Sequence, residues 1–517
     1  MRGLNLVCCR TGRVANVAHS IRQIQSRTVG TDSVVDPRPF HEIPEEGYPL
    51  IGNLIGVMRN TKRSYLYFKE MHEKHGPIFR QKVVSIDTIF VLDPVGVEQV
   101  FRAEPKYPKR FDIDIWRQVR KEIGERDGLL TSATNRRNEP MKPTLEGSDW
   151  YSQRRKVNPV MLNTQVVYST VNSVAEVVRD FLDYLLPLQI NNHSVDINEE
   201  IFKWSVETIG KVLYDTRFGC FGVNPSVEGK DFANAVKTIF QTTEEVITFP
   251  GTVAKVLFRK TWEKHKDATA HLFKTARKYI DQTREMMKER DREAHGNISL
   301  LQRLLTRSEW EEGEIYASVT EIMAGAVDTT ANTIVFAVDI LSRNPDIQEK
   351  LYAELFDVIR ENEPIAANFQ NTPYLRGVVK ETLRLYPATN ILGRTLQEDT
   401  VVLGYKIPKG CIVIFPLYAI GRNEKVYKDP YHFKPERWFR DPSSKKSHDP
   451  FAFLPFGFGT RMCIGRRIAE LEMHTFLALM YKRFQTQLTN DKPLELATRM
   501  VLIPNSPVQI RLIPRVS

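Results

Sequence analysis

A single cysteine in a glycine-rich segment carries the strongest chemical signal in this sequence. Cys463 lies in the segment 456–465, FGFGTRMCIG, with an aromatic residue seven positions before it and an arginine two positions before it. Gly457 and Gly459 permit backbone angles that other residues disfavour, so the segment can form a tight turn. No second cysteine or histidine follows at zinc-ligand spacing, which argues against a structural zinc site. The segment therefore predicts a turn that presents one sulfur ligand.

The residues after the cysteine favour its thiolate form. A helical pattern begins at Ile468–Leu471, and the amides at the start of a helix stabilise a negative sulfur nearby. Gly465 leaves room at this junction. A lone cysteinate suits haem iron, to which it gives electron density that favours O–O cleavage. The alternative is a buried cysteine in an ordinary turn, which is the commoner state of a lone cysteine.

Taken together, these ten positions resemble the Phe-x-x-Gly-x-Arg-x-Cys-x-Gly signature of the cytochrome P450 family of haem-thiolate monooxygenases. The resemblance extends from about Tyr48 to the C-terminus. It implies a mainly α-helical fold with small peripheral β-sheets and haem b (iron protoporphyrin IX) as the cofactor. It also implies that Cys463 ligates the iron, with Phe456 and Arg461 beside the haem.

A long apolar helical pattern contains an acid followed by an alcohol, Asp328 and Thr329. Thr329 can donate back to the carbonyl of Gly325 and bend the helix, which frees backbone groups to hold water. Splitting O₂ needs two protons, so a carboxylate beside a hydroxyl has a clear catalytic task. The segment resembles the oxygen-activating helix of the family, with Ala326 where glycine is usual. A helix with a capped polar pocket is the alternative.

Three charged residues are predicted to hold the cysteine segment in place. Glu381 and Arg384 lie three apart on one face of a helical pattern, and Pro435–Trp438 follows downstream. This order resembles two scaffold motifs of the family, with Trp438 in place of phenylalanine. The resemblance implies that Glu381, Arg384 and Arg437 form a buried ion network of structural importance, in which loss of one partner can cost ~3–5 kcal/mol.

Further arginines are candidates to bind the haem propionates, because a guanidinium stays charged and bonds a carboxylate through two donors. Trp150 and Arg154 resemble the Trp-x-x-x-Arg pair whose side chains reach a propionate in the family. Arg394 and Arg461 are the other candidates. For Arg394 the alternative is an ordinary surface arginine.

The excess positive charge of the chain is concentrated at its start. The 517 residues carry a formal net charge of +10, and residues 1–31 contain five arginines and no acidic residue. This composition predicts a mitochondrial transit peptide, with a disordered basic tail as the alternative. Residues 32–60 form a proline-punctuated entry segment, and 61–517 form the haem-thiolate monooxygenase domain. No apolar run near the start approaches the ~20 residues of a membrane span, and five unpatterned cysteines favour a reducing compartment.

The periodicity of the remaining sequence predicts the elements that position these residues. Helical spacing dominates residues 165–380, and residues 61–75 also form a helical pattern. Runs rich in β-branched and aromatic residues predict strands at Phe79–Val84, Thr88–Leu92, Thr400–Phe415 and Val508–Leu512. The polar stretch Thr131–Lys142 is expected to be a mobile loop without chemistry of its own.

Four basic residues are candidates to dock an electron donor. Arg376 and Lys380 lie four apart on the helix of Glu381, and Arg466 and Arg467 follow the cysteine segment. They resemble positions at which the mitochondrial branch of the family docks an acidic adrenodoxin-type ferredoxin, a 2Fe-2S protein served by an NADPH-dependent reductase. Complementary charge speeds such an encounter. A solvated charged face is the alternative, but no flavin or nicotinamide domain is evident in this chain.

The substrate is predicted to be lipophilic, with no nucleic-acid partner. Within the mitochondrial branch, Glu314–Glu321 and Ala326–Asn332 look most like the hydroxylases that act at C-24 of the vitamin D side chain, which implies a sterol or secosteroid. Broad oxidation of foreign lipophiles and a haem-thiolate sensor or carrier without turnover are the alternatives. Candidate pocket residues, each of which could equally belong to the core, are Ile322, Ala326, Thr389, Asn390, Ile391 and Leu502.

The stretch Val246–Trp262 mixes apolar and basic residues around a Pro-Gly break. It could lie on the matrix side of the inner mitochondrial membrane and admit lipid-soluble substrates. A buried helix-loop-helix is the alternative.

Overall fold

The structure is a computed structural model of the chain. The described residues are 36–47, 52–83, 86–110, 113–131, 147–222, 224–247, 249–290, 298–307, 309–311, 313–359, 369–439, 449–490 and 492–515. The predicted transit peptide, part of the entry segment and the polar stretch Thr131–Lys142 (except Thr131 itself) lie outside these residues.

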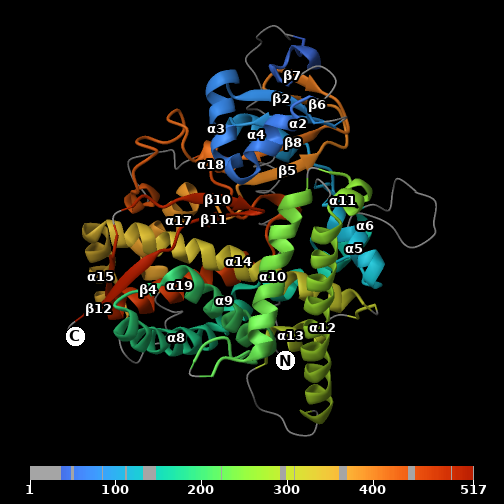
Figure 1. Cartoon of the computed structure of the whole chain (residues 1–517). Helices are drawn as coiled ribbons and strands as arrows, with labels where there is room; N and C mark the ends of the chain where they lie inside the picture. The colour runs from blue at the N-terminus through green and yellow to red at the C-terminus, as the bar shows by residue number, and fades with distance from the viewer. Residues whose placement is uncertain are drawn as a thin grey trace, which may run out of the picture.

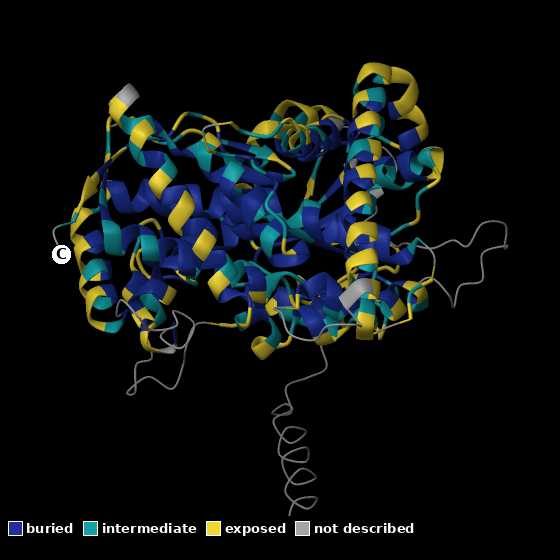
Figure 2. Cartoon of the chain, turned by 90° about the horizontal axis from the view of Figure 1, so that it is seen from below, coloured by how far each residue is buried: buried dark blue, intermediate teal, exposed yellow. Residues whose placement is uncertain are grey.

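Long helices form the larger part of the molecule, and a β-sheet with short helices lies at one end (Figure 1). Buried residues gather along the middle of the helical part, while exposed residues lie on its outer faces (Figure 2). The main helices there are α5 (Asp114–Ile123), α6 (Ser148–Met161), α8 (Val171–Asn192), α9 (Ile197–Tyr214), α10 (Val227–Val246), α12 (Arg259–Arg290), α14 (Glu314–Arg343), α15 (Pro345–Val358), α17 (Pro373–Leu385) and α19 (Arg466–Arg483). Shorter helices there are α7 (Thr164–Tyr168), α11 (Gly251–Leu257) and α13 (Leu300–Arg307).

Helix α14 runs through the middle of the helical part, where it contacts α9, α12, α15, α17 and α19 (Figure 1). Residues on nearly every side of it are buried, which is typical of a helix packed all round. Among the described residues it is the one helix long and apolar enough to cross a membrane, and most of it is buried inside the protein. Residues Ala324–Ala326 are only partly covered, although the turns before and after them are buried.

The sheet at the end of the molecule has five strands in the order β1-β2-β3-β8-β5. Its strands are β1 (Glu45–Glu46), β2 (Ile78–Val83), β3 (Ile86–Val91), β5 (Ile391–Thr395) and β8 (Ile412–Pro416). Strands β2 and β3 form an antiparallel hairpin, whereas β3 pairs with β8 in parallel. The sheet packs in a separate hydrophobic cluster with α3 (Ser64–His75) and α4 (Pro94–Arg102), and α2 (Leu54–Asn60) and α18 (Leu417–Ile420) lie nearby.

The smaller sheets lie at the periphery. One has the order β4-β12-β9, formed by Val195–Asp196, Gln509–Pro514 and Phe484–Leu488. Two antiparallel pairs complete the set: β6 (Thr400–Val402) with β7 (Tyr405–Ile407), and β10 (Leu496–Arg499) with β11 (Val501–Pro504). The prediction of a mainly α-helical fold with small peripheral β-sheets is therefore confirmed. Strands β5, β9, β10 and β11 were not predicted, because strands of four or five residues give little periodic signal.

Candidate active site

Cys463 lies at the end of a tight loop that leads into α19. Gly457 and Gly459 have φ angles of 73° and 70°, which glycine adopts without strain. The Cys463 amide donates to the Phe456 carbonyl at 2.8 Å and closes the loop. A Cβ placed on Gly465 would lie 3.9 Å from the Cys463 Sγ, so the start of α19 comes close to the sulfur. The two glycines thus adopt the backbone angles that the predicted turn requires.

The Cys463 thiol faces open space within the protein. Its side chain is exposed, whereas the other cysteines that the structure describes are buried. The surrounding protein nevertheless raises the pKa of the thiol by desolvation. Opposing this effect on the pKa, the amides of Gly465 and Arg466 donate toward the sulfur, and the guanidinium groups of Arg154 and Arg110 attract negative charge. A metal ion at this position would complete the deprotonation, because coordination removes the thiol proton.

Four arginines lie close together beside this loop: Arg110, Arg154, Arg394 and Arg461. Burial lowers the pKa of Arg110 to about 10, that of Arg154 to about 10 and that of Arg461 to about 9. The neighbouring cations lower the pKa of Arg110 and Arg461 further. In the described part of the chain, the carboxylate that pairs with this group is Glu104, which forms an ion pair with Arg394.

This excess of positive charge fits a ligand with two carboxylates. Arg154 Nε is buried and has no hydrogen-bond partner among the described residues. Buried charges are stable only when they are paired, and here four guanidinium groups face one carboxylate. The two propionates of haem would supply the missing anions, and guanidinium groups match them in geometry. The residues present therefore fit haem, with Cys463 as the iron ligand and the arginines around the propionates.

Helix α14 borders open space at its middle. Thr329 Oγ1 donates to the Gly325 carbonyl at 2.8 Å, the bond that its sequence position predicts. A Cβ placed on Gly325 would meet no atom within 4 Å. Thr329 is itself half-buried, in contrast to the buried residues on either side of it. The side of α14 that carries Gly325 is therefore open to a ligand.

Asp328, next to Thr329, is an acid suited to proton exchange near neutral pH. It is 8% exposed, and burial raises its pKa to about 6. Asn332 Nδ2 donates to Asp328 Oδ1 at 2.9 Å, which opposes the rise in pKa, as do the charges of Lys237 and Arg499. Asn332 is not among the predicted site residues, although its i, i+4 spacing from Asp328 is a signal of this contact in the sequence.

Comparison with known proteins agrees with this geometry. The model of the family described as cytochrome P450 matches residues 43–512. The chain belongs to the cytochrome P450 family. It is similar to the mouse mitochondrial 1,25-dihydroxyvitamin D(3) 24-hydroxylase, with 31% identity over 90% of this chain and 88% of that protein. It is also similar to rat mitochondrial cytochrome P450 11B2, with 30% identity over 93% of this chain and 92% of that protein. The mitochondrial cholesterol side-chain cleavage enzyme of Macaca fascicularis is 30% identical over 93% of this chain and 91% of that enzyme.

This cytochrome P450 is thus a haem-dependent monooxygenase. Bound haem would supply the chemistry of O₂ activation. The residues of the chain would hold the haem and deliver protons beside it. Cys463 would hold the iron at the end of its loop, while α19 amides stabilise the sulfur's charge. Thr329 Oγ1 would give a hydrogen bond or a proton on the open side of α14, and Asp328 would resupply it from a carboxyl group with a pKa of about 6.

The position of Trp150 differs from the prediction. Its single N–H donates to the Leu129 carbonyl at 3.1 Å, so it has no hydrogen left for a propionate. The guanidinium of Arg461 lies over its ring, 3.5 Å from the centroid. Trp150 is therefore placed to support Arg461 by a cation–π contact. Arg394 is 4% exposed, so the alternative of a surface arginine is wrong.

Arg110 belongs to the arginine cluster and Glu104 pairs with it, although neither is among the predicted site residues. Arg110 donates to the Arg461 carbonyl, and Glu104 accepts from Arg394. Both come from the segment after α4, far from the other members in sequence. A buried arginine cannot be told from a surface arginine by residue type alone, because most arginines are exposed.

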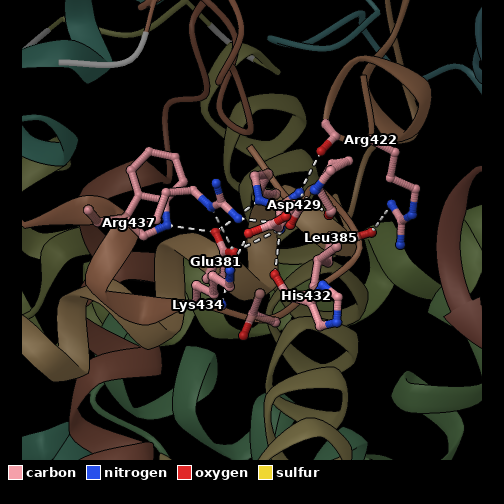
Figure 3. Close-up of polar contacts among 12 residues, drawn as sticks. Glu381, Leu385, Arg422, Asp429, His432, Lys434 and Arg437 are labelled. Carbon is pink, nitrogen blue, oxygen red and sulfur yellow. Dashed lines mark hydrogen bonds and ion pairs between the residues drawn. The ribbon is translucent and has the colours of Figure 1, made fainter. Parts of the chain in front are cut away.

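Glu381, which is fully buried, is the centre of a polar network that joins α17 to the turn Pro435–Trp438 (Figure 3). It accepts from Arg384 Nη2 at 2.7 Å, from Arg437 Nε at 3.1 Å and from Trp438 Nε1 at 2.9 Å. Arg384 also donates to backbone carbonyls, including that of Pro430 at 2.7 Å. The predicted network residues are thus in contact, and Trp438 adds a donor that phenylalanine lacks.

The predicted pocket residues differ in their exposure. Ala326, Thr389 and Ile391 are partly exposed, whereas Ile322 and Asn390 are buried. Leu502 is fully buried in a small cluster with other large side chains, which include Tyr65, Phe336 and Tyr418. The prediction that Leu502 lines a pocket is therefore corrected, because its side chain belongs to this cluster. The side to which Leu502 points depends on its place in β11, and this strand was not predicted.

The four predicted docking residues lie at the surface near the cysteine loop. Arg376 and Lys380 are exposed on α17. The pKa of Lys380 is lowered by partial burial and by the charges of Arg376 and Arg466. Arg466 pairs with Glu470 at 3.0 Å, and Arg467 lies 3.9 Å from the same carboxylate. We call these four residues the basic cluster.

Proposed function

We propose that this cytochrome P450 hydroxylates a sterol or secosteroid inside mitochondria, with electrons from an adrenodoxin-type 2Fe-2S ferredoxin and its NADPH-dependent reductase. The similar proteins from mouse, rat and macaque are mitochondrial, and two of them are named for vitamin D and cholesterol. At about 30% identity, these names support a class of substrate and not a particular compound.

The observation that carries the choice of donor is the basic cluster. Its cations come from α17 and from the start of α19, directly after the loop of Cys463. Arg376 and Arg466 lower the pKa of Lys380 because the positive charges repel one another. An anionic protein surface bound here would relieve this repulsion. An acidic ferredoxin bound here would bring its iron–sulfur cluster to the sulfur side of the haem, and opposite charge would speed its arrival.

Helix α11 supports access from a membrane. Val253, Val256 and Leu257 are 40%, 77% and 65% exposed. Ala254 and Trp262 are buried against α5, so the segment also packs on the protein. We propose that the exposed apolar side chains rest on the matrix side of the inner mitochondrial membrane, where lipid-soluble substrates are held.

Reconstitution with adrenodoxin, its reductase and NADPH tests this function. Haem difference spectra would first be screened over sterols, secosteroids and foreign lipophiles. Product analysis with ¹⁸O₂ would then test whether one oxygen atom enters the bound compound. Hydroxylation of a sterol or secosteroid supports the proposal, whereas turnover of foreign lipophiles alone contradicts the substrate class. NADPH consumption that stays at background with every bound compound would instead indicate a sensor or carrier.

A further inference from the structure

Glu244 is a buried carboxylate that has no role in the mechanism described above. It lies on α10 and is 8% exposed. Its Oε1 has no hydrogen-bond partner among the described residues. Buried polar atoms in folded proteins nearly always have a partner, because an unpaired one costs most of its desolvation energy. Glu244 therefore needs a partner that the described part of the chain does not provide.

The charges around Glu244 link it to Asp328 on α14. Arg499, at the end of β10, interacts electrostatically with both Glu244 and Asp328. Helix α10 contacts α14 and β10, and Figure 1 shows α10 passing in front of α14. Lys62 is the second cation that acts on Glu244. Arg499 is exposed, whereas Glu244 and Asp328 are buried, so one cation at the surface acts on two buried acids.

A second unpaired acceptor belongs to the same region. Asn390 is 2% exposed, and its Oδ1 has no partner in the described part of the chain. Its Nδ2 donates to Ser64 Oγ at 3.4 Å, and Ser64 Oγ donates to Thr498 Oγ1 at 3.1 Å. Thr498 directly precedes Arg499, and Ser64 lies two residues after Lys62, the other cation that acts on Glu244. Two buried acceptors without partners in the described chain are thus linked to the same two segments, residues 62–64 and 498–499, which points to a ligand with a hydrogen-bond donor.

We propose that Glu244 binds a hydroxyl group that the substrate already carries before oxidation. This inference rests on the proposed function, because it names the polar group of the lipophilic substrate. An ammonium group would be repelled by Arg499 and Lys62, and a carboxylate would be repelled by Glu244 itself. A hydroxyl group is uncharged and so avoids both repulsions. It can also both donate and accept a hydrogen bond. Burial raises the pKa of Glu244 to about 7, so a hydroxyl partner would serve its ionised and its neutral form alike.

Paired ligands that differ by one hydroxyl group test this proposal on the haem-loaded enzyme. The pairs are cholesterol with cholest-5-ene, vitamin D3 with its 3-deoxy analogue, and androsterone with 5α-androstan-17-one. Dissociation constants come from the shift of the Soret band. Wild type should bind the hydroxyl member of at least one pair about tenfold more tightly or better, as expected when the deoxy compound leaves a buried group unpaired.

Substitution of Glu244 should act on that ratio. In Glu244→Leu the preference for the hydroxyl member should fall to about onefold, while Glu244→Gln should keep most of it, since an amide also donates and accepts. The control is Glu245→Gln, which changes the adjacent exposed carboxylate and should leave the ratio unchanged. A purely structural role of Glu244 would weaken both members of a pair equally.

Three results would overturn the inference: equal binding of both members of every pair by wild type, an unchanged preference in Glu244→Leu, or no binding of any hydroxylated member. These results are separate from the proposed function. NADPH consumption and product formation in the reconstituted system test catalysis whether or not a hydroxyl is recognised.

Discussion

Arg120 on α5 forms a buried ion pair with Glu321 on α14. Their side chains are 8% and 2% exposed, and Thr131 Oγ1 joins them by a 2.8 Å hydrogen bond to Glu321 Oε1. The Leu130 amide donates to Glu321 Oε2 at 2.5 Å. One carboxylate thus fastens the segment after α5 to the helix that carries Asp328, about two turns before that acid.

Glu321→Gln should destabilise the haem-loaded enzyme by ~3–5 kcal/mol, because Arg120 would remain buried without a counter-charge. Urea unfolding followed by the Soret band and by circular dichroism measures the loss. The control is Glu285→Gln, which breaks an ion pair with Lys288 whose side chains are 68% and 72% exposed, and which should cost less than about 1 kcal/mol. Equal losses in both variants would show that the buried pair has no special weight.

Trp438→Phe should lower the free energy of unfolding by about 1.5–3 kcal/mol, the usual value of a hydrogen bond to a charged group. Trp438 Nε1 donates to Glu381 Oε2 at 2.9 Å, and phenylalanine keeps most of the ring's packing without that donor. Glu381→Gln should cost more, because it leaves Arg384 and Arg437 without their carboxylate. The order of the two losses, read from unfolding curves, is the test; a larger loss in Trp438→Phe would contradict it.

Thr329→Ala should divert electrons from product to hydrogen peroxide when a hydroxylated compound has been identified. Thr329 Oγ1 lies on the open side of α14, and its loss removes the group proposed to hold a proton there. Peroxide formed per NADPH consumed is the measurement. Thr333→Ala, one turn further along the same helix, is the matched control, since Thr333 is buried and bonds only the Thr329 carbonyl among the described residues. Full coupling in Thr329→Ala would remove the proton-delivery role.

Glu472→Gln should change how stability depends on pH. Burial raises the pKa of Glu472 to about 8 from the usual 4.5, and its Oε1 has no partner in the described chain. An acid whose pKa is raised by folding is neutral in both states below about pH 4.5. It then costs stability as the pH rises toward 8, because the unfolded chain ionises first. Wild type should therefore lose ~3–5 kcal/mol over this interval relative to Glu472→Gln. Parallel stability curves for the two proteins would refute this expectation.

The sequence predicted those parts of the site that depend on neighbours along the chain. The positive φ angles of Gly457 and Gly459, the bond from Thr329 to Gly325 and the pairing of Glu381 with Arg384 all follow from spacings of one to four residues. Such spacings fix geometry once the helix or turn is known.

Contacts between distant segments could not be predicted in the same way. Arg120 and Glu321 are 201 residues apart, and Glu104 meets Arg394 across 290 residues. Neither pair has a periodic signal, because the approach of the two elements depends on packing throughout the fold. The unpaired Oε1 of Glu244 is likewise visible only when its surroundings are known.

Charge reversal in the basic cluster should weaken reduction by ferredoxin. Lys380→Glu places an acid near Arg376 and Arg466, where it would repel an acidic partner. The rate of adrenodoxin-dependent reduction should therefore fall about tenfold at low salt. The fall should be smaller at about 0.5 M salt, because salt screens exposed charges. Stopped-flow formation of the reduced carbon-monoxide complex gives the rate. Lys288→Glu, which makes the same change at an exposed site on α12, is the control. Because dithionite reduces haem without docking, both variants should form the complex normally with that reductant. Equal ferredoxin-dependent rates in wild type and Lys380→Glu would move the docking surface elsewhere.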